Sequence, residues 1–142
     1  MSKRRKIPDP IRQQAAERAR YRCSYCRAPA QVGIPMVIDH IIPLAADGSS
    51  EIENLCLSCY RCNEFKGPRT SAEDPVTEQT IPFFNPNTQT WADHFTWSKD
   101  SLRMIGLSAV GRATIQALGL NADWLIQGRQ IWKLVGLQPP LD

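Results

Sequence analysis

The sequence has no apolar run that approaches the roughly 20 residues of a membrane-spanning helix. Its N-terminal end is basic, but no apolar stretch follows it, which argues against a secretory signal peptide. Histidine is scarce, since His40 and His94 are the two in 142 residues. These absences favour a cytoplasmic protein that does not associate with membranes.

Acidic residues are few at the start of the chain. Residues 1–27 hold nine lysines and arginines against two acidic residues, a net charge of +7, whereas residues 28–142 hold eight against twelve, a net charge of −4. A basic end of this kind favours contact with a polyanion such as nucleic acid. The alternative is a solvated tail that aids solubility, and the charge pattern alone leaves both open. The nine basic residues are Lys3, Arg4, Arg5, Lys6, Arg12, Arg18, Arg20, Arg22 and Arg27.

Five cysteines stand out against this background. Cys23 and Cys26 form one C-x-x-C pair, and a later stretch contains Cys56, Cys59 and Cys62 at every third position. In a cytoplasmic chain, paired cysteines indicate metal ligands more readily than disulfides. Two such pairs predict a tetrahedral thiolate site for a zinc ion, and four protein ligands make it a closed, structural site. The spacing allows either Cys56 with Cys59 or Cys59 with Cys62 as the second pair. Free buried cysteines or a redox pair are the alternatives.

Four polar residues between and beside the cysteine pairs are not needed by a structural zinc site. Asp39 and His40 end a predicted strand within residues 33–40, and Asn54 and Asn63 flank the later cysteines. Each has an ordinary structural explanation as a turn residue, a helix cap or a hydrogen-bonded core side chain. Together they form an ordered set: C-x-x-C, D-H, N-L and C-x-x-C-N-x-x-K-G.

This set resembles the HNH endonuclease family. The resemblance covers residues 21–67 and rests on "YRCSYC", "IDHIIPLAADGSSEIENL" and "CYRCNEFKG". It implies an α+β fold of the ββα-metal (HNH, His-Me finger) type, in which two antiparallel strands and a helix hold one divalent ion. It also implies hydrolysis of a phosphodiester bond in nucleic acid, with double-stranded DNA as the expected substrate.

The resemblance assigns a role to each polar residue. His40 matches the general base that activates the attacking water, and Asn54 matches the asparagine that orients the loop bearing the histidine. Asp39 and Asn63 match the ligands of the catalytic ion. An oxygen-donating carboxylate and amide favour Mg²⁺ or Mn²⁺, and an asparagine in place of the family's last histidine strengthens that preference. A bend or strand end at residues 39–40 is predicted, because successive strand side chains point in opposite directions.

The resemblance to the family also selects the zinc ligands and suggests contacts with the substrate. It assigns zinc to Cys23, Cys26, Cys59 and Cys62, and it leaves Cys56 as a small buried side chain. Lys66 lies one helical turn after Asn63 and is a candidate phosphate contact, although a solvated lysine at a helix end is equally compatible. Arg61 and Arg69 are weaker candidates of the same kind.

The remaining sequence predicts packing more than chemistry. Residues 1–70 are expected to form the zinc-stapled nuclease lobe, residues 71–90 a linker or long loop, and residues 91–142 a C-terminal portion that packs on the lobe. That portion is expected to contain a hairpin around Lys99 and Asp100 and two helices capped by Ser108 and Asn121. His94 is expected to be packed or capping rather than a ligand. No oligomeric state is indicated.

Two functions from different classes follow. The first is a metal-dependent endonuclease with a structural zinc ion and a catalytic Mg²⁺ or Mn²⁺. The second is a zinc-stabilised module that binds nucleic acid without cleaving it. The presence of Asp39, His40 and Asn63 together favours the enzyme.

Overall fold

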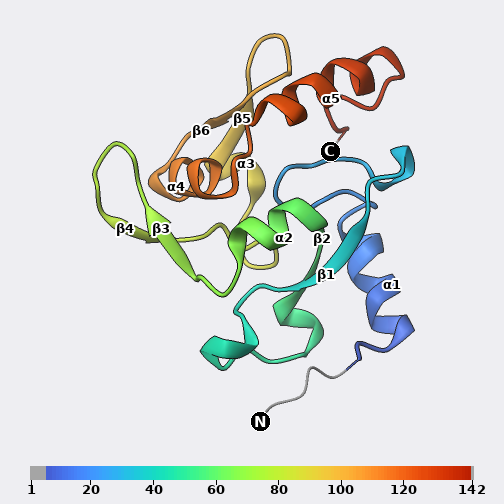
Figure 1. Ribbon diagram of the computed structural model, residues 1–142, viewed down its shortest axis with the longest axis vertical. Coiled ribbons are helices and arrows are strands. Elements are labelled where there is room, and N and C mark those ends of the chain that lie inside the picture. Colours follow the sequence, from blue (N-terminus) through green and yellow to red (C-terminus); the bar gives the residue numbers. More distant parts are fainter. Residues whose placement is uncertain (1–5, 142) are drawn as a thin grey trace.

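The computed structural model describes residues 6–141, so Lys3, Arg4 and Arg5 of the basic end lie outside the described residues. It is a small α+β structure whose described strands pair into three two-stranded antiparallel sheets. Figure 1 shows the N-terminal elements on one side, the C-terminal hairpin and helices on the other, and α2 between them. Among residues 6–141, no helix is both long and apolar enough to cross a bilayer.

The first sheet pairs β1 (Met36–His40) with β2 (Leu55–Cys59), and Asp39 lies opposite Cys56 in the register. One face of this sheet is apolar and packs on α1 (Asp9–Arg18) through a cluster of buried residues. Two short 3-10 turns, Leu44–Ala46 and Ile52–Asn54, lie in the connection between the strands. The predicted strand and its end at His40 are confirmed. The buried cluster is Ile7, Ala15, Ile38, Leu55 and Leu57.

Helix α2 (Tyr60–Lys66) begins directly where β2 ends. Cys59 is its N-cap, and the Cys59 sulfur accepts a hydrogen bond from the backbone N–H of Cys62 at 3.3 Å. Gly67 ends the helix with a positive φ of 54°, a conformation that glycine adopts at little cost. The predicted short helix is therefore confirmed, and its start is set by a cysteine.

The segment from residue 71 to residue 90, expected to be a linker or long loop, contains a short hairpin of β3 (Ser71–Glu73) and β4 (Thr80–Pro82). Asp74 follows β3 and is fully buried. Its carboxylate accepts two hydrogen bonds from Arg112 at 3.0 and 2.9 Å, which hold the pKa of that carboxyl well below its usual range. This ion pair fixes the hairpin to the C-terminal helix α4 (Ala109–Leu118).

The C-terminal portion follows the predicted order. A helical turn, α3 (Trp91–His94), precedes a hairpin of β5 (Phe95–Trp97) and β6 (Met104–Gly106), then α4 and α5 (Asp123–Leu134). Ser108 caps α4 as expected, and its hydroxyl also lies 2.7 Å from His94 Nδ1. The prediction that Asn121 caps α5 was wrong. The N-cap is Ala122, and the Asn121 amide instead bonds the backbone N–H and C=O of Met104.

One buried arginine connects α5 with the first cysteine pair. Arg129 is completely buried, and its guanidinium donates hydrogen bonds to four oxygens while lying 5.0 Å from the centre of the Trp97 ring. Burial lowers its pKa below the usual arginine value. Because a buried charge is costly unless hydrogen bonds compensate it, these bonds from the two terminal nitrogens fix both segments. The acceptors are the Leu102, Leu120 and Cys26 carbonyls and the Asn121 side chain.

Replacing Arg129 with methionine is expected to lower the free energy of unfolding by about 3 kcal/mol or more, because several buried oxygens lose a charged donor. Exposed Arg103 provides the matched control. Its replacement by methionine should change the free energy of unfolding by no more than about 0.5 kcal/mol. Urea unfolding of both variants provides the measurement, and equal effects would show that Arg129 is not a structural tie.

Candidate active site and metal centre

Four cysteine side chains converge in the interior. Their ligand atoms all lie within 4.8 Å of one another, and all four residues are buried. Two come from the loop after α1 and two from the junction of β2 with α2. The set is Cys23, Cys26, Cys59 and Cys62, so the structure brings together the four residues that were predicted as zinc ligands.

The surroundings of these sulfurs suit a bound cation. The Cys23 sulfur accepts hydrogen bonds from the backbone N–H groups of Tyr25 and Cys26, both at 3.4 Å. Burial alone would raise the pKa of the Cys23 thiol, but hydrogen bonds from the other three thiols outweigh it and lower the pKa well below the usual value. The pKa values of Cys26 and Cys62 are raised well above theirs, so the four thiols cannot all ionise readily without a cation. Zinc is the ion that this donor set fits.

Cys56 lies outside this cluster, as expected. It is buried, and its sulfur lies 3.7 Å from the Tyr25 hydroxyl and 3.8 Å from Asp39 Oδ2. Burial raises the pKa of this thiol far above its usual value, so it stays neutral. Cys56 therefore packs beside Asp39 instead of binding the metal.

Asp39 points into the protein and is only 3% exposed. Its Oδ2 accepts a hydrogen bond from the Tyr25 hydroxyl at 2.7 Å, and its Oδ1 lies 3.4 Å from Lys66 Nζ. Burial raises the pKa of the carboxyl, while Lys66 and Tyr25 oppose that rise. Tyr25 lies between Cys23 and Cys26, so the loop of the first cysteine pair directly contacts the predicted catalytic ligand. The sequence does not reveal this contact, because only the fold brings Tyr25 next to β1.

Lys66 lies in a different environment from either one that the sequence suggested. It is 1% exposed, whereas a phosphate contact or a solvated lysine would be open to solvent. Besides its ion pair with Asp39, its ammonium group donates a hydrogen bond to the His40 carbonyl at 3.0 Å. In this conformation Lys66 therefore holds the end of β1, and its contact with a phosphate stays a prediction.

His40 is buried at the end of β1, and its Nε2 lies 3.0 Å from the Ser50 hydroxyl. Asn54 fixes the loop that carries this serine. The Asn54 amide receives a hydrogen bond from Ile42 N–H at 2.8 Å and donates to the Ile42 and Ser49 carbonyls at 2.9 and 2.7 Å. These contacts match the loop-orienting role that the resemblance implies.

Gly48 completes this loop. A β-carbon at this position would lie 1.7 Å from the Ile42 carbonyl oxygen and 2.9 Å from the Asn54 amide nitrogen. Only glycine therefore lets the chain approach the Asn54 side chain so closely. The Asp-Gly pair signals a turn in the sequence, but the sequence does not reveal that Asn54 occupies the inside of that turn.

The remaining predicted residues lie on or near α2. Asn63 is half-buried in its first turn, one turn before Lys66. The Arg61 guanidinium lies over the rings of Phe65 and Trp124, at 4.9 and 5.4 Å from their centres, and so connects α2 to α5.

Arg69 has a comparable structural role just after α2. It donates a hydrogen bond to the Lys66 carbonyl at 3.3 Å and lies over the Phe83 ring, 5.5 Å from its centre. Arg61 and Arg69 are exposed, and their contacts with nucleic acid stay predictions.

Comparisons with known proteins concern this same part of the chain. The family described as HNH endonuclease matches residues 23–69. A 60-residue stretch is 40% identical to the CRISPR-associated endonuclease Cas9 of Corynebacterium diphtheriae. That stretch covers 42% of this chain and 5% of the Cas9 chain. No solved structure matches. The resemblance to the HNH endonuclease family is thereby confirmed for residues 23–69, the segment that brings together the four clustered cysteines and the Asp39–His40 pair.

Proposed function

We propose that this protein is a metal-dependent endonuclease that hydrolyses phosphodiester bonds of nucleic acid, with double-stranded DNA as its substrate. The observation that carries the proposal is the placement of Asp39 and His40 at the end of β1, beside α2 and its Asn63, inside the segment that matches the HNH family. The β1–β2–α2 unit is then the ββα-metal core. The basic N-terminal residues support a polyanionic substrate.

Each side chain of this unit has a task in the proposed reaction. His40 accepts the proton of the attacking water, and Ser50 holds the imidazole through its Nε2 contact. Asn54 keeps the Ser50 loop in register with the end of β1. These contacts support a base that is held in position before the substrate arrives, which is how positioning contributes to the rate.

The donor chemistry of Asp39 and Asn63 fits a hard divalent ion such as Mg²⁺ or Mn²⁺. A carboxylate has about four acceptor sites, and Tyr25 and Lys66 use two of those of Asp39. When bound, the ion would stabilise the charge that develops on the phosphate and the leaving oxygen. Lys66 holds Oδ1 in the described conformation, so an ion competes with that ammonium group for the carboxylate.

The same ion pair favours a second function. Asp39 and Lys66 satisfy each other in the interior, so the fold is complete without a divalent ion at Asp39. This observation supports a zinc-stabilised module that binds nucleic acid without cleaving it. His40 distinguishes the two functions, because binding does not require a general base.

Nicking of supercoiled plasmid in Mg²⁺ or Mn²⁺ tests the enzyme directly. Wild type should convert the plasmid to the open circle, and His40→Ala should do so about 100-fold or more slowly, because general-base catalysis typically contributes that much. His94→Ala is the matched control, since it removes the other histidine and should nick at nearly the wild-type rate. If wild type and His40→Ala behave alike, the non-catalytic module is the correct function.

The zinc assignment predicts different outcomes for neighbouring cysteines. Cys59→Ser or Cys62→Ser should lose about one zinc ion per chain and unfold the lobe of residues 1–70, because structural zinc contributes folding energy directly. Cys56→Ser should keep its zinc, since its sulfur contacts Tyr25 and Asp39 instead. Metal analysis and far-UV circular dichroism of the three variants provide the measurement, and unchanged zinc in Cys62→Ser would contradict the assignment.

Tyr25 is expected to position Asp39 for the catalytic ion. Tyr25→Phe removes the 2.7 Å hydrogen bond, and it should weaken Mn²⁺ binding about 10–100-fold, as loss of a residue that orients a metal ligand typically does. Calorimetry without nucleic acid measures this affinity. Exposed Tyr60 lies in the second C-x-x-C pair, so Tyr60→Phe is the matched control. Equal Mn²⁺ affinities in the two variants, both with full zinc content, would show that Tyr25 has no such role.

A further inference from the structure

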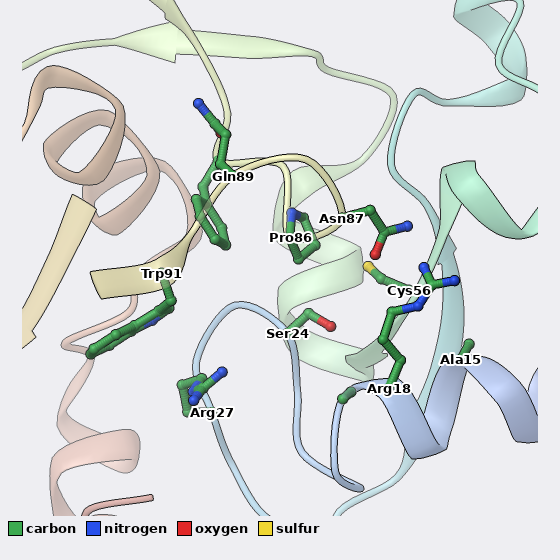
Figure 2. Close-up of a pocket in the computed structure, with 11 residues that line it drawn as sticks. Ala15, Arg18, Ser24, Arg27, Cys56, Pro86, Asn87, Gln89 and Trp91 are labelled. Carbon is green, nitrogen blue, oxygen red and sulfur yellow. The ribbon is translucent and has the colours of Figure 1, made fainter. Parts of the chain in front are cut away.

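A groove at the C-terminal end of α1 is lined by arginines and lies outside the site described above. It consists of two neighbouring cavities of about 320 and 90 Å³ that share Arg18, Ala19 and Arg27. Figure 2 shows the smaller cavity, with Arg18 and Arg27 on one side and Asn87, Gln89 and Trp91 on the other. Neither Asp39 nor His40 lines either cavity.

We call this surface the arginine groove and define it by Arg18, Arg20, Arg22 and Arg27, all four of which line the larger cavity. Arg22 and Arg27 form its half-buried floor. Arg22 donates hydrogen bonds to the Arg27 and Leu137 carbonyls at 2.8 and 2.7 Å, and the Arg27 guanidinium lies 5.2 Å from the centre of the Trp91 ring. The floor charges are therefore held in place by the fold.

Arg18 and Arg20 form the exposed rim of the groove. Each is anchored by one hydrogen bond to a carbonyl, from Arg18 to Ile52 at 3.4 Å and from Arg20 to Leu141 at 3.3 Å. A guanidinium has five N–H donors in a planar fork, so one such bond leaves most of the donors of each rim arginine available. A planar fork of this kind matches a phosphate group.

Among the residues that the structure describes, those that line the two cavities include no aspartate or glutamate. Glu17 of α1 instead accepts a hydrogen bond from the neighbouring Gln13 side chain. The two exposed rim arginines, Arg18 and Arg20, line the larger cavity, and their positive charge attracts a polyanion to the groove. Within the described residues, many of the basic side chains from the start of the chain therefore lie on this one hollowed surface.

We propose that the arginine groove binds successive phosphate groups of a nucleic-acid strand, as a second contact separate from the proposed catalytic residues Asp39 and His40. The two cavities are neighbours that share Arg18 and Arg27 in their linings, so the arginines extend over two adjacent hollows, which suits a strand better than a single phosphate. Contacts of this kind position a protein on nucleic acid without reading its sequence. The proposal rests on the proposed function in one respect: the bound strand is taken to be part of the substrate.

The test measures how binding of a fluorescent DNA duplex depends on salt, by anisotropy, in the full chain carrying His40→Ala so that no cleavage occurs. Log affinity falls as log salt rises, and each phosphate contact makes this slope steeper by about 0.9 for duplex DNA. Adding Arg18→Ala and Arg20→Ala should therefore make the slope shallower by about 1.8. The matched control removes two charges from the β5–β6 hairpin, Lys99→Ala with Arg103→Ala, and should leave the slope within about 0.3 of the parent value.

Several outcomes would overturn the proposal. One is an equal slope in the rim and control variants. Another is arginine-dependent binding of inorganic phosphate with unchanged DNA binding, which would make the groove a site for a small anion. If the double variant fails to fold, Arg20→Gln alone should make the slope shallower by about 0.9, and no change would count against the groove. Plasmid nicking by the wild type is scored separately, so failure of the groove and failure of the nuclease give different results.

Discussion

The convergence of four thiols within 4.8 Å is the constraint on which the rest of the structure depends. It places the loop of residues 23–26 against the point where β2 becomes α2, and Cys59 serves both the cluster and the start of the helix. The apolar cluster under α1 is small, so a metal ion held at this junction would add stability to the lobe beyond packing. With the junction fixed, the direction of α2 and the positions of Asn63 and Lys66 follow.

The constraint reaches the candidate active site through a single tyrosine. Tyr25 lies between Cys23 and Cys26, and its hydroxyl binds the carboxylate of Asp39 from the interior. Lys66 approaches the same carboxylate from α2, and it also binds the His40 carbonyl. Both groups therefore reach the end of β1 from elements that the thiol cluster positions. The structural metal site and the proposed catalytic site share one hydrogen-bond network, although their ligand sets are separate.

How much of this was predictable differs between local and long-range features. The strand ending at His40, the short helix that contains Cys62 and the hairpin at residues 95–106 depend on short spacings, so the sequence predicted them. Spacing alone left the second cysteine pair open, and the resemblance to the HNH family selected Cys59 and Cys62. The burial of Lys66 depends on which face of α2 meets β1, and a lysine at a helix end is normally exposed. Asparagine often caps helices, yet the side-chain amide of Asn121 forms hydrogen bonds with the backbone N–H and C=O of Met104, which is distant in the sequence. Side-chain partners of this kind are set by tertiary packing, which a single sequence does not encode locally.

The buried guanidinium of Arg129 becomes intelligible once the charge of the thiol cluster is considered. A zinc ion held by four thiolates carries a net charge of about −2, which is costly in an interior. Arg129 lies against this cluster, donates a hydrogen bond to the Cys26 carbonyl at 3.3 Å, and is favoured in its charged form by Cys26 and Cys62. Its positive charge therefore offsets part of the negative charge of the metal centre. On this argument α5 is not an independent appendage: it would supply the counter-charge of the zinc ion that the thiol cluster could hold, although the last cysteine of that cluster lies more than 60 residues before Arg129 in the chain.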